Sequence, residues 1–488
     1  MEKEPKDNNS EEWQPGERNK EPTVVGEHLR GILENEDIPP SIVQFGGQTA
    51  IKLADALSRA GLPILGTNAE SIDIAEDRAR FQNLLEKIGI PQPPGASVYT
   101  TEEALSTAAI IGYPVLVRPN YVLGGRAMEL IQNAQELTHY FKEDFDLSKS
   151  KAILIDKYLE GIEAEVDAVC DGDEILIPGV MEHIERAGVH SGDSIAVYPP
   201  ISLTSDEIET IVDYTRRINV ALNVRGLINI QFVITRNLSS SEVYVIEANP
   251  RSSRTVPFIS KVTGIPMVNL GTRAMLGEKL AEMGYKGGLW PKQQGLVAVK
   301  APVFSMSKLP GVDTYLGPEM RSTGEVMGID YTFEAALAKA LLSAGISLPE
   351  QGAVLLSLSD RTKPEARPLI QKLAHTGYQL FATEGTAAMI QAMGFQVEKV
   401  LKSLDKGYPN TIDIIRDGLV DVVINTPEGG QVGTLRDGFY IRREAVEKGV
   451  PCFTSLDTAR VAIETMSAKE TKFTVQPLTD YLSKPKAK

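Results

Sequence analysis

The chain has 488 residues, of which 42% are hydrophobic and 24% are charged, a composition typical of a soluble globular protein with two or three domains. Its formal net charge of −15 argues against non-specific binding to nucleic acid or to anionic membranes, because both need a basic surface. The two cysteines, Cys170 and Cys452, lie far apart, which excludes a disulfide framework, disfavours zinc and suits a reducing cytosol.

The chain begins with a polar, charged segment, and we expect residues 1–38 to be a disordered tail. It has no basic-then-apolar leader and no run of 18 apolar residues, so we expect a cytoplasmic protein without a signal peptide or a membrane span. We then expect a short strand at Ile42–Phe45, a helix that ends near Ala60, and a second strand at Ile64–Gly66. Two strands make only part of an α/β sheet, so residues 39–70 are interpreted as the remnant of a domain whose beginning is missing.

Residues 71–285 combine helices with strand hairpins, which predicts an α+β domain. The predicted helices are Asp73–Ile88 and about Ser205–Leu222. Strands are expected at Pro114–Pro119, Ala127–Ile131, Ile153–Leu159, Glu165–Val169, Glu174–Pro178, Leu227–Ile234 and Val243–Ile246. The sequence Asp171–Asp173 is typical of a turn and predicts a hairpin between two of these strands.

From Ala353 onward strands and helices alternate strictly, which predicts a separate doubly wound α/β domain with a parallel sheet over residues 346–470. Its strands are expected at Ala353–Ser359, Gln379–Thr383, Gln396–Leu401, Val420–Thr426 and Pro451–Ser455. Residues 286–345 are interpreted as an extension and linker, and residues 471–488 as a mobile tail.

The most informative stretch follows the last strand of the α+β domain. Side chains alternate along a strand, so Glu247 and Asn249 share one face, and a hairpin turn near residues 237–241 places Gln231 opposite Glu247. Carboxylate and amide oxygens grouped in this way are ligands for Mg²⁺. Arg251 adds a planar fork that suits a phosphate or a carboxylate. A polar hairpin end at the surface is the alternative interpretation.

A glycine pair lies between two arginines. Gly124–Gly125 separates Arg118, at the end of a strand, from Arg126, and glycines let the backbone approach an anion closely. The pattern predicts a phosphate-binding loop, with a hairpin turn and solvated arginines as the alternative. Gly188–Ser194 is a second loop of small polar residues, in which His190 either contacts a nucleotide or only holds the loop.

The last domain has polar residues where its strands end. Thr383 ends one strand and Thr386 lies at the start of the next helix, while Asn425 and Thr426 end another strand. Ligands of doubly wound sheets gather at the carboxyl ends of the strands, and helix N-termini favour phosphate. A phosphorylated ligand is therefore predicted here, and helix capping by the threonines is the alternative.

Seven longer motifs can be read together: Phe45–Thr49, Ala75–Arg78, Arg118–Met128, Met181–Ile184, Gly188–Ser194, Glu247–Phe258 and Ser322–Gly328. They resemble the C-terminal half of the large chain of carbamoyl-phosphate synthase, and the resemblance covers about Ser41 to Thr465. It implies an ATP-grasp domain, in which two α+β lobes enclose ATP, followed by a regulatory domain like that of methylglyoxal synthase. The implied activity is the phosphorylation of carbamate by ATP to carbamoyl phosphate, for pyrimidine and arginine biosynthesis.

The resemblance also implies a role for each matching residue. Gln231, Glu247 and Asn249 would hold Mg²⁺ or Mn²⁺, with K⁺ as a further candidate cation, and Arg251 would steady the transferring phosphoryl group or the carbamate. The matching ATP-site residues are Arg118, Lys157, Leu159 (through its backbone), Glu163 (through the ribose hydroxyls), Gly188, Val189, His190 and Ser191. The residues that would bind a phosphorylated or nucleotide effector are Lys363, Thr383, Thr386, Lys402, Asn425 and Thr426.

Two departures from the family pattern bear on function. The earlier half of the large chain, which forms carbamate, is absent, so the resemblance implies a partner chain that supplies it and a glutamine amidotransferase small chain. The domain before the ATP-grasp fold is cut to its last strands. Two other hypotheses therefore stay open: a different ATP-grasp carboxylate ligase, and a catalytically inactive subunit that binds ATP and an effector.

Overall fold

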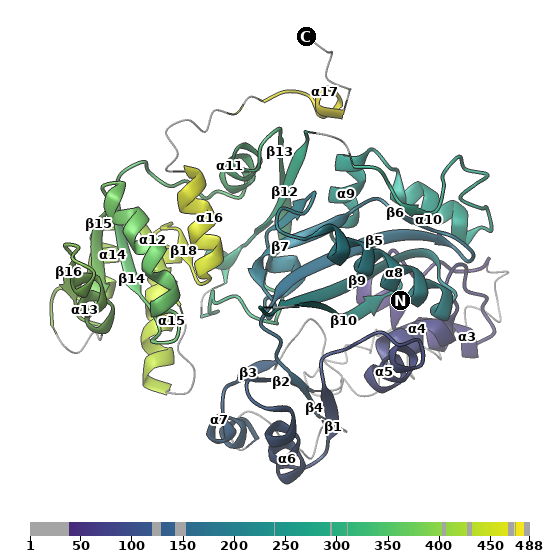
Figure 1. Ribbon diagram of the computed structural model, residues 1–488, viewed down its shortest axis with the longest axis horizontal. Coiled ribbons are helices and arrows are strands. Elements are labelled where there is room, and N and C mark those ends of the chain that lie inside the picture. Colours follow the sequence, from purple (N-terminus) through teal and green to yellow (C-terminus); the bar gives the residue numbers. More distant parts are fainter. Residues whose placement is uncertain are drawn as a thin grey trace, which may run out of the picture.

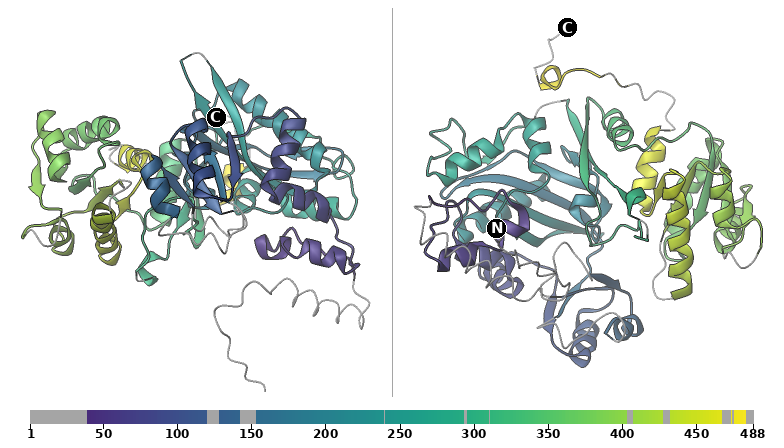
Figure 2. Two further views of the ribbon diagram at one scale, coloured as in Figure 1. Left: turned by 90° about the horizontal axis from the view of Figure 1, so that it is seen from below. Right: turned by 180° about the vertical axis from the view of Figure 1, so that it is seen from behind.

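The computed structural model describes residues 39–119, 128–141, 153–238, 240–292, 295–309, 311–402, 407–426, 432–466, 473 and 475–482. Within these residues the strands form three sheets, and helices cover the faces of the sheets (Figure 1). A four-stranded sheet makes a small lobe, a nine-stranded sheet makes a large lobe, and a five-stranded sheet makes the last domain. Figure 2 shows from behind that the small lobe and the last domain lie on different sides of the large sheet.

The small lobe is an antiparallel sheet with two helices packed against it. Its strand order is β1 (Gly95–Val98), β4 (Ile153–Lys157), β2 (Val115–Pro119) and β3 (Glu129–Ile131). The helices are α6 (Thr101–Ile111) and α7 (Ala134–His139). Alternate strand positions, such as Val115, Val117, Ile153 and Ile155, face these helices and form a core of their own. The three strands expected here are confirmed with shorter bounds: β2 and β3 begin later than predicted, and β4 ends two residues earlier. Residue 127 lies outside the described residues.

The large lobe is built on a long, mainly antiparallel sheet. Its strand order is β10 (Ser241–Asn249), β9 (Arg225–Arg236), β5 (Ile162–Asp171), β7 (Val180–Arg186), β8 (Ala196–Tyr198), β12 (Val297–Val303) and β13 (Gly324–Asp330), and β6 (Ile175–Ile177) pairs with β5 and with β11 (Gly288–Leu289). Helix α8 (Ser205–Leu222) covers one face, and α9 (Val256–Thr263) and α10 (Met267–Met275) cover the other. Neighbouring residues of β5 enter opposite cores, as alternation requires: Ala168 packs toward α8, and Val169 toward α9 and α10.

The segment before the small lobe differs from the prediction. The two expected strands reduce to one parallel bridge between Ser41 and Ile64, because a strand pair with no third strand gains too little stabilisation. The helices here are α2 (Gly47–Ile51), α3 (Ala54–Arg59), α4 (Ala69–Glu76) and α5 (Arg78–Lys87). The single helix expected over Asp73–Ile88 is interrupted at Asp77, whose backbone is extended and whose side chain caps α5 by accepting from the Arg80 N–H.

Gln44 ties this first segment to the large lobe. Its buried side-chain amide donates to the Arg225 carbonyl at 3.0 Å and to the Thr67 hydroxyl at 2.8 Å, and its oxygen accepts from the Leu227 N–H at 3.0 Å. Its backbone carbonyl accepts from the N–H of Ser252 at 2.9 Å. The first segment is thus fixed beside the turn that follows β10.

The last domain is a parallel sheet with helices between its strands, as predicted. Its strand order is β16 (Glu398–Val400), β15 (Gln379–Thr383), β14 (Ala353–Ser357), β17 (Val422–Asn425) and β18 (Cys452–Phe453). Its helices are α12 (Lys363–His375), α13 (Glu384–Ala392), α14 (Thr411–Arg416), α15 (Val432–Glu447) and α16 (Leu456–Met466). One core runs from Val299 of β12 through α11 (Phe333–Ser343) into this sheet, so the domain is packed firmly against the large lobe.

The end of the chain returns to the large lobe, where a mobile tail was expected. Helix α17 (Leu478–Leu482) buries Tyr481 in the same core as α9 and α10. The Tyr481 hydroxyl accepts from Lys339 Nζ at 2.6 Å. Lys339 also pairs with Asp330 at 2.6 Å. An aromatic ring with a polar edge can anchor a short segment in this way, and composition alone gave no sign of it. No helix among the described residues is both long enough and apolar enough to cross a membrane.

Helix α8 begins with a capping box, and its acid stability can be tested. The carboxylate of Glu207 accepts from the Thr204 N–H and pairs with Arg236, which lowers the pKa of Glu207 to about 2. A lowered pKa contributes stability above the unfolded value, 4.5, and that contribution is lost as pH falls toward 2. We expect Glu207→Gln to cost about 1–3 kcal/mol at neutral pH and progressively less below pH 4 in urea denaturation. Glu209→Gln, at an exposed position of the same helix, is the control and should show neither effect.

Candidate active site

The predicted site residues line one cavity of about 840 Å³ between the small and large lobes. The small lobe contributes the ends of β2 and β4, and the large lobe contributes β5, the loop after β7, β9, β10 and the turn that follows β10. The predicted ATP-site, metal-site and phosphoryl-site residues that line it are Arg118, Lys157, Leu159, Glu163, Gly188, Val189, His190, Ser191, Gln231, Glu247, Asn249 and Arg251. The glycine loop predicted at Gly124–Gly125 lies outside the described residues.

The hairpin of β9 and β10 has the predicted register. Glu247 lies opposite Gln231, and Asn249 lies opposite Asn229. A register shift between Val245 and Glu247 marks a bulge, a feature that re-aims side chains at the end of a strand. The Asn249 amide donates to Glu247 Oε1 at 2.9 Å, so the carboxylate and both predicted amides lie together at the floor of the cavity.

This donor set fits a hard divalent cation that shares its ligands with phosphates. The amide nitrogen of Gln231 donates to Ser191 Oγ at 3.0 Å and that of Asn249 donates to Glu247. The amide oxygens are then the groups that could face a cation, and that of Asn249 accepts from Arg251 in this structure. Among the described residues no group of three His, Cys, Asp or Glu side chains is placed to hold a metal ion. Mg²⁺ commonly takes one or two carboxylates and completes its shell with phosphates and water, so one carboxylate and two amides suffice.

Two arginines meet one carboxylate under the small lobe. Arg78 and Arg118 lie 3.3 and 3.5 Å from the two oxygens of Asp156. Arg78 also donates to the Ile246 carbonyl, which the bulge exposes, at 2.9 Å. Burial lowers the pKa of Arg78, and the adjacent Asp156 offsets part of that effect. Arg78 and Asp156 were not predicted as site residues, although Arg78 ends one of the family-like motifs.

Lys157 and Arg251 are held by neighbouring oxygens. Lys157 Nζ donates to the carbonyls of Gly112 and Tyr113 at 3.0 and 2.9 Å, so in this conformation its charge is directed into the small lobe. Arg251 donates to Asn249 Oδ1 at 3.3 Å, and its buried Nε has no hydrogen-bond partner. The guanidinium of Arg251 therefore keeps a donor beside the proposed metal ligands.

The loop after β7 is held by its own backbone and by His190. Gly188 has φ +105°, a conformation that glycine adopts without strain. The N–H of His190 donates to the Gly317 carbonyl at 2.8 Å, and its Nδ1 accepts from the Gly192 N–H at 3.0 Å. His190 therefore holds the loop. Burial lowers the pKa of His190, which favours the neutral ring that such an accepting nitrogen requires.

A buried cluster of ionisable groups lies below Glu163. His183 Nε2 is 3.1 Å from Glu165, and its Nδ1 is 3.8 Å from Glu163. Burial raises the pKa of Glu163 to about 7, although His183 opposes the shift. Asn229 bridges Glu165 and Asp167 through bonds of 3.2 and 3.1 Å. Sequence reasoning predicted Glu163 and noted the motif around His183, but it missed their association with Glu165 and Asp167, because charged residues inside otherwise apolar strands resemble no short motif.

The predicted effector residues gather at one edge of the last sheet. Thr383 begins α13 without a side-chain capping bond, so helix capping does not explain it. Thr386 Oγ1 accepts from the Leu358 N–H at 3.2 Å, and Thr426 Oγ1 accepts from the Ser359 N–H at 2.9 Å. The other predicted residues lie at the same edge: Asn425 at the end of β17, Lys363 at the start of α12 and Lys402 just beyond β16.

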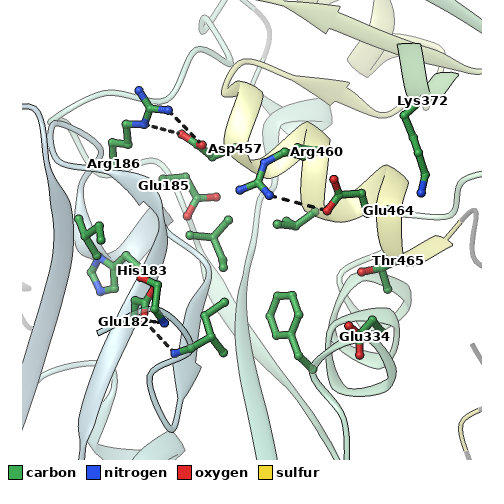
Figure 3. Close-up of a pocket in the computed structure, with 16 residues that line it drawn as sticks. Glu182, His183, Glu185, Arg186, Glu334, Lys372, Asp457, Arg460, Glu464 and Thr465 are labelled. Carbon is green, nitrogen blue, oxygen red and sulfur yellow. Dashed lines mark hydrogen bonds and ion pairs between the residues drawn. The ribbon is translucent and has the colours of Figure 1, made fainter. Parts of the chain in front are cut away.

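A second cavity, of about 650 Å³, lies between β7 and the helices of the last domain (Figure 3). Arg186 at its rim reaches Asp457 of α16 at 3.2 Å, and the Thr458 hydroxyl donates to Glu185 at 2.7 Å. These contacts join the last domain to the strand that also carries His183.

The sequence matches three family models along its length. Residues 21–74 match the carbamoyl phosphate synthase preATP-grasp domain, residues 77–283 the carbamoyl-phosphate synthase L chain ATP binding domain, and residues 365–454 the MGS-like domain. The carbamoyl phosphate synthase large chain of Thermomicrobium roseum is 57% identical over 446 residues, which are 91% of this chain and 41% of that one. The chain is similar over most of its own length to this large chain. It spans less than half the length of this relative.

Solved structures of biotin carboxylases share the fold of this chain's ATP-grasp part. The biotin carboxylase domain of Hydrogenobacter thermophilus 2-oxoglutarate carboxylase superposes with a TM-score of 0.52 at 18% identity, covering 66% of this chain and 77% of that one. Campylobacter jejuni biotin carboxylase superposes with a TM-score of 0.50 at 17% identity, covering 65% and 77%. The predicted fold, an ATP-grasp domain followed by a doubly wound MGS-like domain, is confirmed.

Proposed function

We propose that this chain phosphorylates carbamate with ATP and forms carbamoyl phosphate and ADP. The observation that carries the proposal is the convergence of Gln231, Glu247, Asn249 and Arg251 at the floor of a cavity between two ATP-grasp lobes, in a chain that matches the carbamoyl-phosphate synthase L chain ATP binding domain. In the reaction a carbamate oxygen attacks the γ-phosphorus of ATP, a C–O–P linkage forms, and the bond to the ADP oxygen breaks.

The side chains act mainly by position and charge, because phosphoryl transfer needs no covalent protein intermediate. Arg78 and Arg118 offer positive charge from the small-lobe side of the cavity, and Arg251 offers a fork beside Glu247. Glu163 lines the same cavity as an acceptor for the ribose hydroxyls. The two lobes together exclude water from the transferring group.

The metal is proposed to be Mg²⁺ or Mn²⁺, held by Glu247 and the amide oxygens of Gln231 and Asn249. Such an ion neutralises charge on the transferring phosphate when it is bound. K⁺ stays a further candidate cation, and we assign no residues to it.

We also propose a source for the carbamate substrate. We propose that a chain of the same family supplies the carbamate-forming half and that a glutamine amidotransferase small chain supplies ammonia, within pyrimidine and arginine biosynthesis. The support is that this chain covers 41% of its relative's length and carries one ATP-binding-domain match.

The direct test is the partial back reaction, ATP formation from ADP and carbamoyl phosphate with Mg²⁺. It needs neither glutamine nor the carbamate-forming half. Turnover by the purified chain supports the proposed function. Binding of MgADP by calorimetry without any turnover would favour the alternative, an inactive ATP-binding subunit.

We also propose that the last domain binds a phosphorylated effector that acts on the ATP site. Arg442, itself buried, donates to Asn425 Oδ1 at 2.6 Å and to Asp313 Oδ1 at 2.7 Å. Four residues beyond Asp313, the Gly317 carbonyl accepts from the N–H of His190. A shift of Asn425 on binding has a short route of hydrogen bonds to the nucleotide loop, consistent with a coupling of about 1–3 kcal/mol.

The effector proposal predicts a separable loss of binding. The double variant Thr383→Val/Thr386→Val should weaken binding of phosphorylated effectors at least tenfold, because two hydroxyls at the strand ends are lost. ATP formation without effector should stay within about twofold. Calorimetry with nucleoside monophosphates and phosphorylated sugars, on the full chain, measures the first effect. Thr376→Val, at the opposite end of α12, is the control; unchanged effector binding in the double variant would make the threonines structural.

A further inference from the structure

Lys300 is a lysine in the interior of the large lobe that the family-like motifs do not include. It lies in the middle of β12, between Ala196 of β8 and Met327 of β13, and only 1% of its surface is exposed. Lysine is almost never buried to this extent without a counter-charge, because removing an ammonium from water is costly. The groups around the Lys300 ammonium therefore indicate its role.

Within the described part of the chain, Lys300 has one hydrogen-bond acceptor, and that acceptor is uncharged. Its Nζ donates to the Ser191 carbonyl at 2.9 Å. Among the described residues no carboxylate lies within 4.0 Å of this nitrogen. An ammonium carries three N–H donors, so two of them are not used by the protein.

The nearby charged groups are committed elsewhere or lie too far away for an ion pair. Glu165 on β5 is bonded to His183 on β7 and to Asn229. The charge of Lys300 acts on the pKa of Glu325 on β13, but the two side chains form no ion pair. His190 cannot supply a negative charge, because its ring is neutral or positively charged. The Lys300 ammonium therefore has carboxylates at a distance and none in direct contact.

Lys300 is one of the residues that line the nucleotide cavity. Most other cations there already contact protein oxygens: Arg78 and Arg118 contact Asp156, Lys157 contacts backbone carbonyls, and Arg254 contacts Ser322 at 3.2 Å, while Arg251 keeps a free Nε–H. We propose that Lys300 contacts substrate directly, and that an anionic oxygen of the substrate is its missing counter-charge. The inference rests on the proposed function and adds a binding residue to it.

Two anions in this reaction have the required chemistry. One is a phosphate oxygen of the nucleotide, and the other is an oxygen of carbamate or carbamoyl phosphate. Both would accept a charge-assisted hydrogen bond from an ammonium already held by Ser191. Separate binding measurements can tell the two apart.

The proposal predicts opposite effects on stability and on binding. Lys300→Met keeps the length of the side chain and removes a buried charge without a partner, so the protein without ligands should melt at the same temperature or higher. The same change should weaken binding of the substrate that Lys300 contacts by roughly tenfold to a hundredfold. A lysine that only braced the Ser191 loop would show the reverse: a lower melting temperature with a modest change in affinity.

The experiment compares wild type with Lys300→Met and Lys300→Gln. It measures the melting temperature without ligands, the affinity for ADP and ATP with Mg²⁺ by calorimetry, and the KM for carbamoyl phosphate in the back reaction. Lys300→Gln replaces the ammonium with an uncharged polar group, and so decides the outcome if the methionine variant is poorly folded. Lys339→Met is the matched control, since Lys339 is bonded to Asp330 and Tyr481: it should melt lower and bind substrates normally.

Each result bears on one conclusion. Weaker nucleotide affinity assigns the contact to phosphate, and a higher KM for carbamoyl phosphate with unchanged nucleotide affinity assigns it to the acyl substrate. Unchanged affinity for both in the variants overturns the inference while the proposed function stands. If wild type itself forms no ATP, the function proposal fails, and the nucleotide titrations still decide whether Lys300 contacts phosphate.

Discussion

Glu247→Gln is expected to lower metal-dependent ATP formation by about a hundredfold or more, equivalent to at least about 2.7 kcal/mol of activation free energy. Glu247 is the one carboxylate among the three proposed metal ligands, and it lies opposite Gln231 across the hairpin. A neutral amide cannot match its charge, although glutamine has the same shape and can still accept from Asn249. The back reaction over a range of Mg²⁺ concentrations measures the loss.

Nucleotide affinity in Glu247→Gln distinguishes loss of the metal site from general damage to the cavity. ADP affinity without Mg²⁺ should change much less than turnover, because the proposed ribose contact is Glu163, on another strand of the cavity. Glu242→Gln, an exposed position on the same strand, should leave both unchanged. A Glu247→Gln enzyme with near wild-type turnover would remove Glu247 from the metal site.

The hairpin explains why this part of the site is readable from sequence. Alternation along β9 and β10, together with a short turn, fixes the pairing as far as Val245 with Phe232, because a slip of one residue would put the apolar side chains on the wrong face. The bulge before Glu247 then shifts the register by one residue and brings Glu247 opposite Gln231, where an unbroken ladder would pair it with Ile230. The last domain is equally readable, since its buried strands are short apolar runs separated by helices.

Other elements depend on contacts that sequence patterns do not encode. The break at Asp77 comes from a capping aspartate inside a continuous helical pattern, and the lone bridge of Ser41 with Ile64 reflects how few strands surround it. Tyr481 fixes the chain end through distant partners on β13 and α11. In the site, Lys157 keeps its predicted place at the cavity wall while its ammonium is bonded to small-lobe carbonyls.

The buried ionisable residues were the largest omission. Glu165 and Lys300 lie in central strands whose neighbours are apolar, and His183 lies inside a motif that was noted without a role for it. One sequence shows the type of such a residue and not its partners. The importance of Glu165 and His183 follows only when three strands bring them and Asn229 within hydrogen-bonding distance, and that of Lys300 only from its burial beside the cavity.

His183 gives the last prediction, on stability and its pH dependence. Burial lowers the pKa of His183, but the hydrogen bond to Glu165 and the charges of Glu165 and Glu163 outweigh this, so the pKa lies above its usual 6.5. A raised histidine pKa contributes stability that is fully present below 6.5 and lost as pH rises through the folded-state value. The raised pKa of Glu163, about 7, acts in the same direction, because folding then favours the protonated carboxyl.

We therefore expect His183→Asn to cost about 3–5 kcal/mol near pH 6, because it leaves Glu165 buried without its cationic partner. The cost should shrink as pH rises above 6.5 and through the folded-state pKa of His183, since wild type then loses the imidazolium and the variant has none to lose. The positive charge of Lys300 disfavours protonation of His183. In Lys300→Met the stabilisation by the His183 imidazolium should therefore persist to a higher pH than in wild type. Thermal unfolding at a series of pH values measures all three, with the exposed His375→Asn as control. If His183→Asn melts in parallel with His375→Asn at every pH, His183 is neutral in the folded protein, and the charge balance argued for this cluster is wrong.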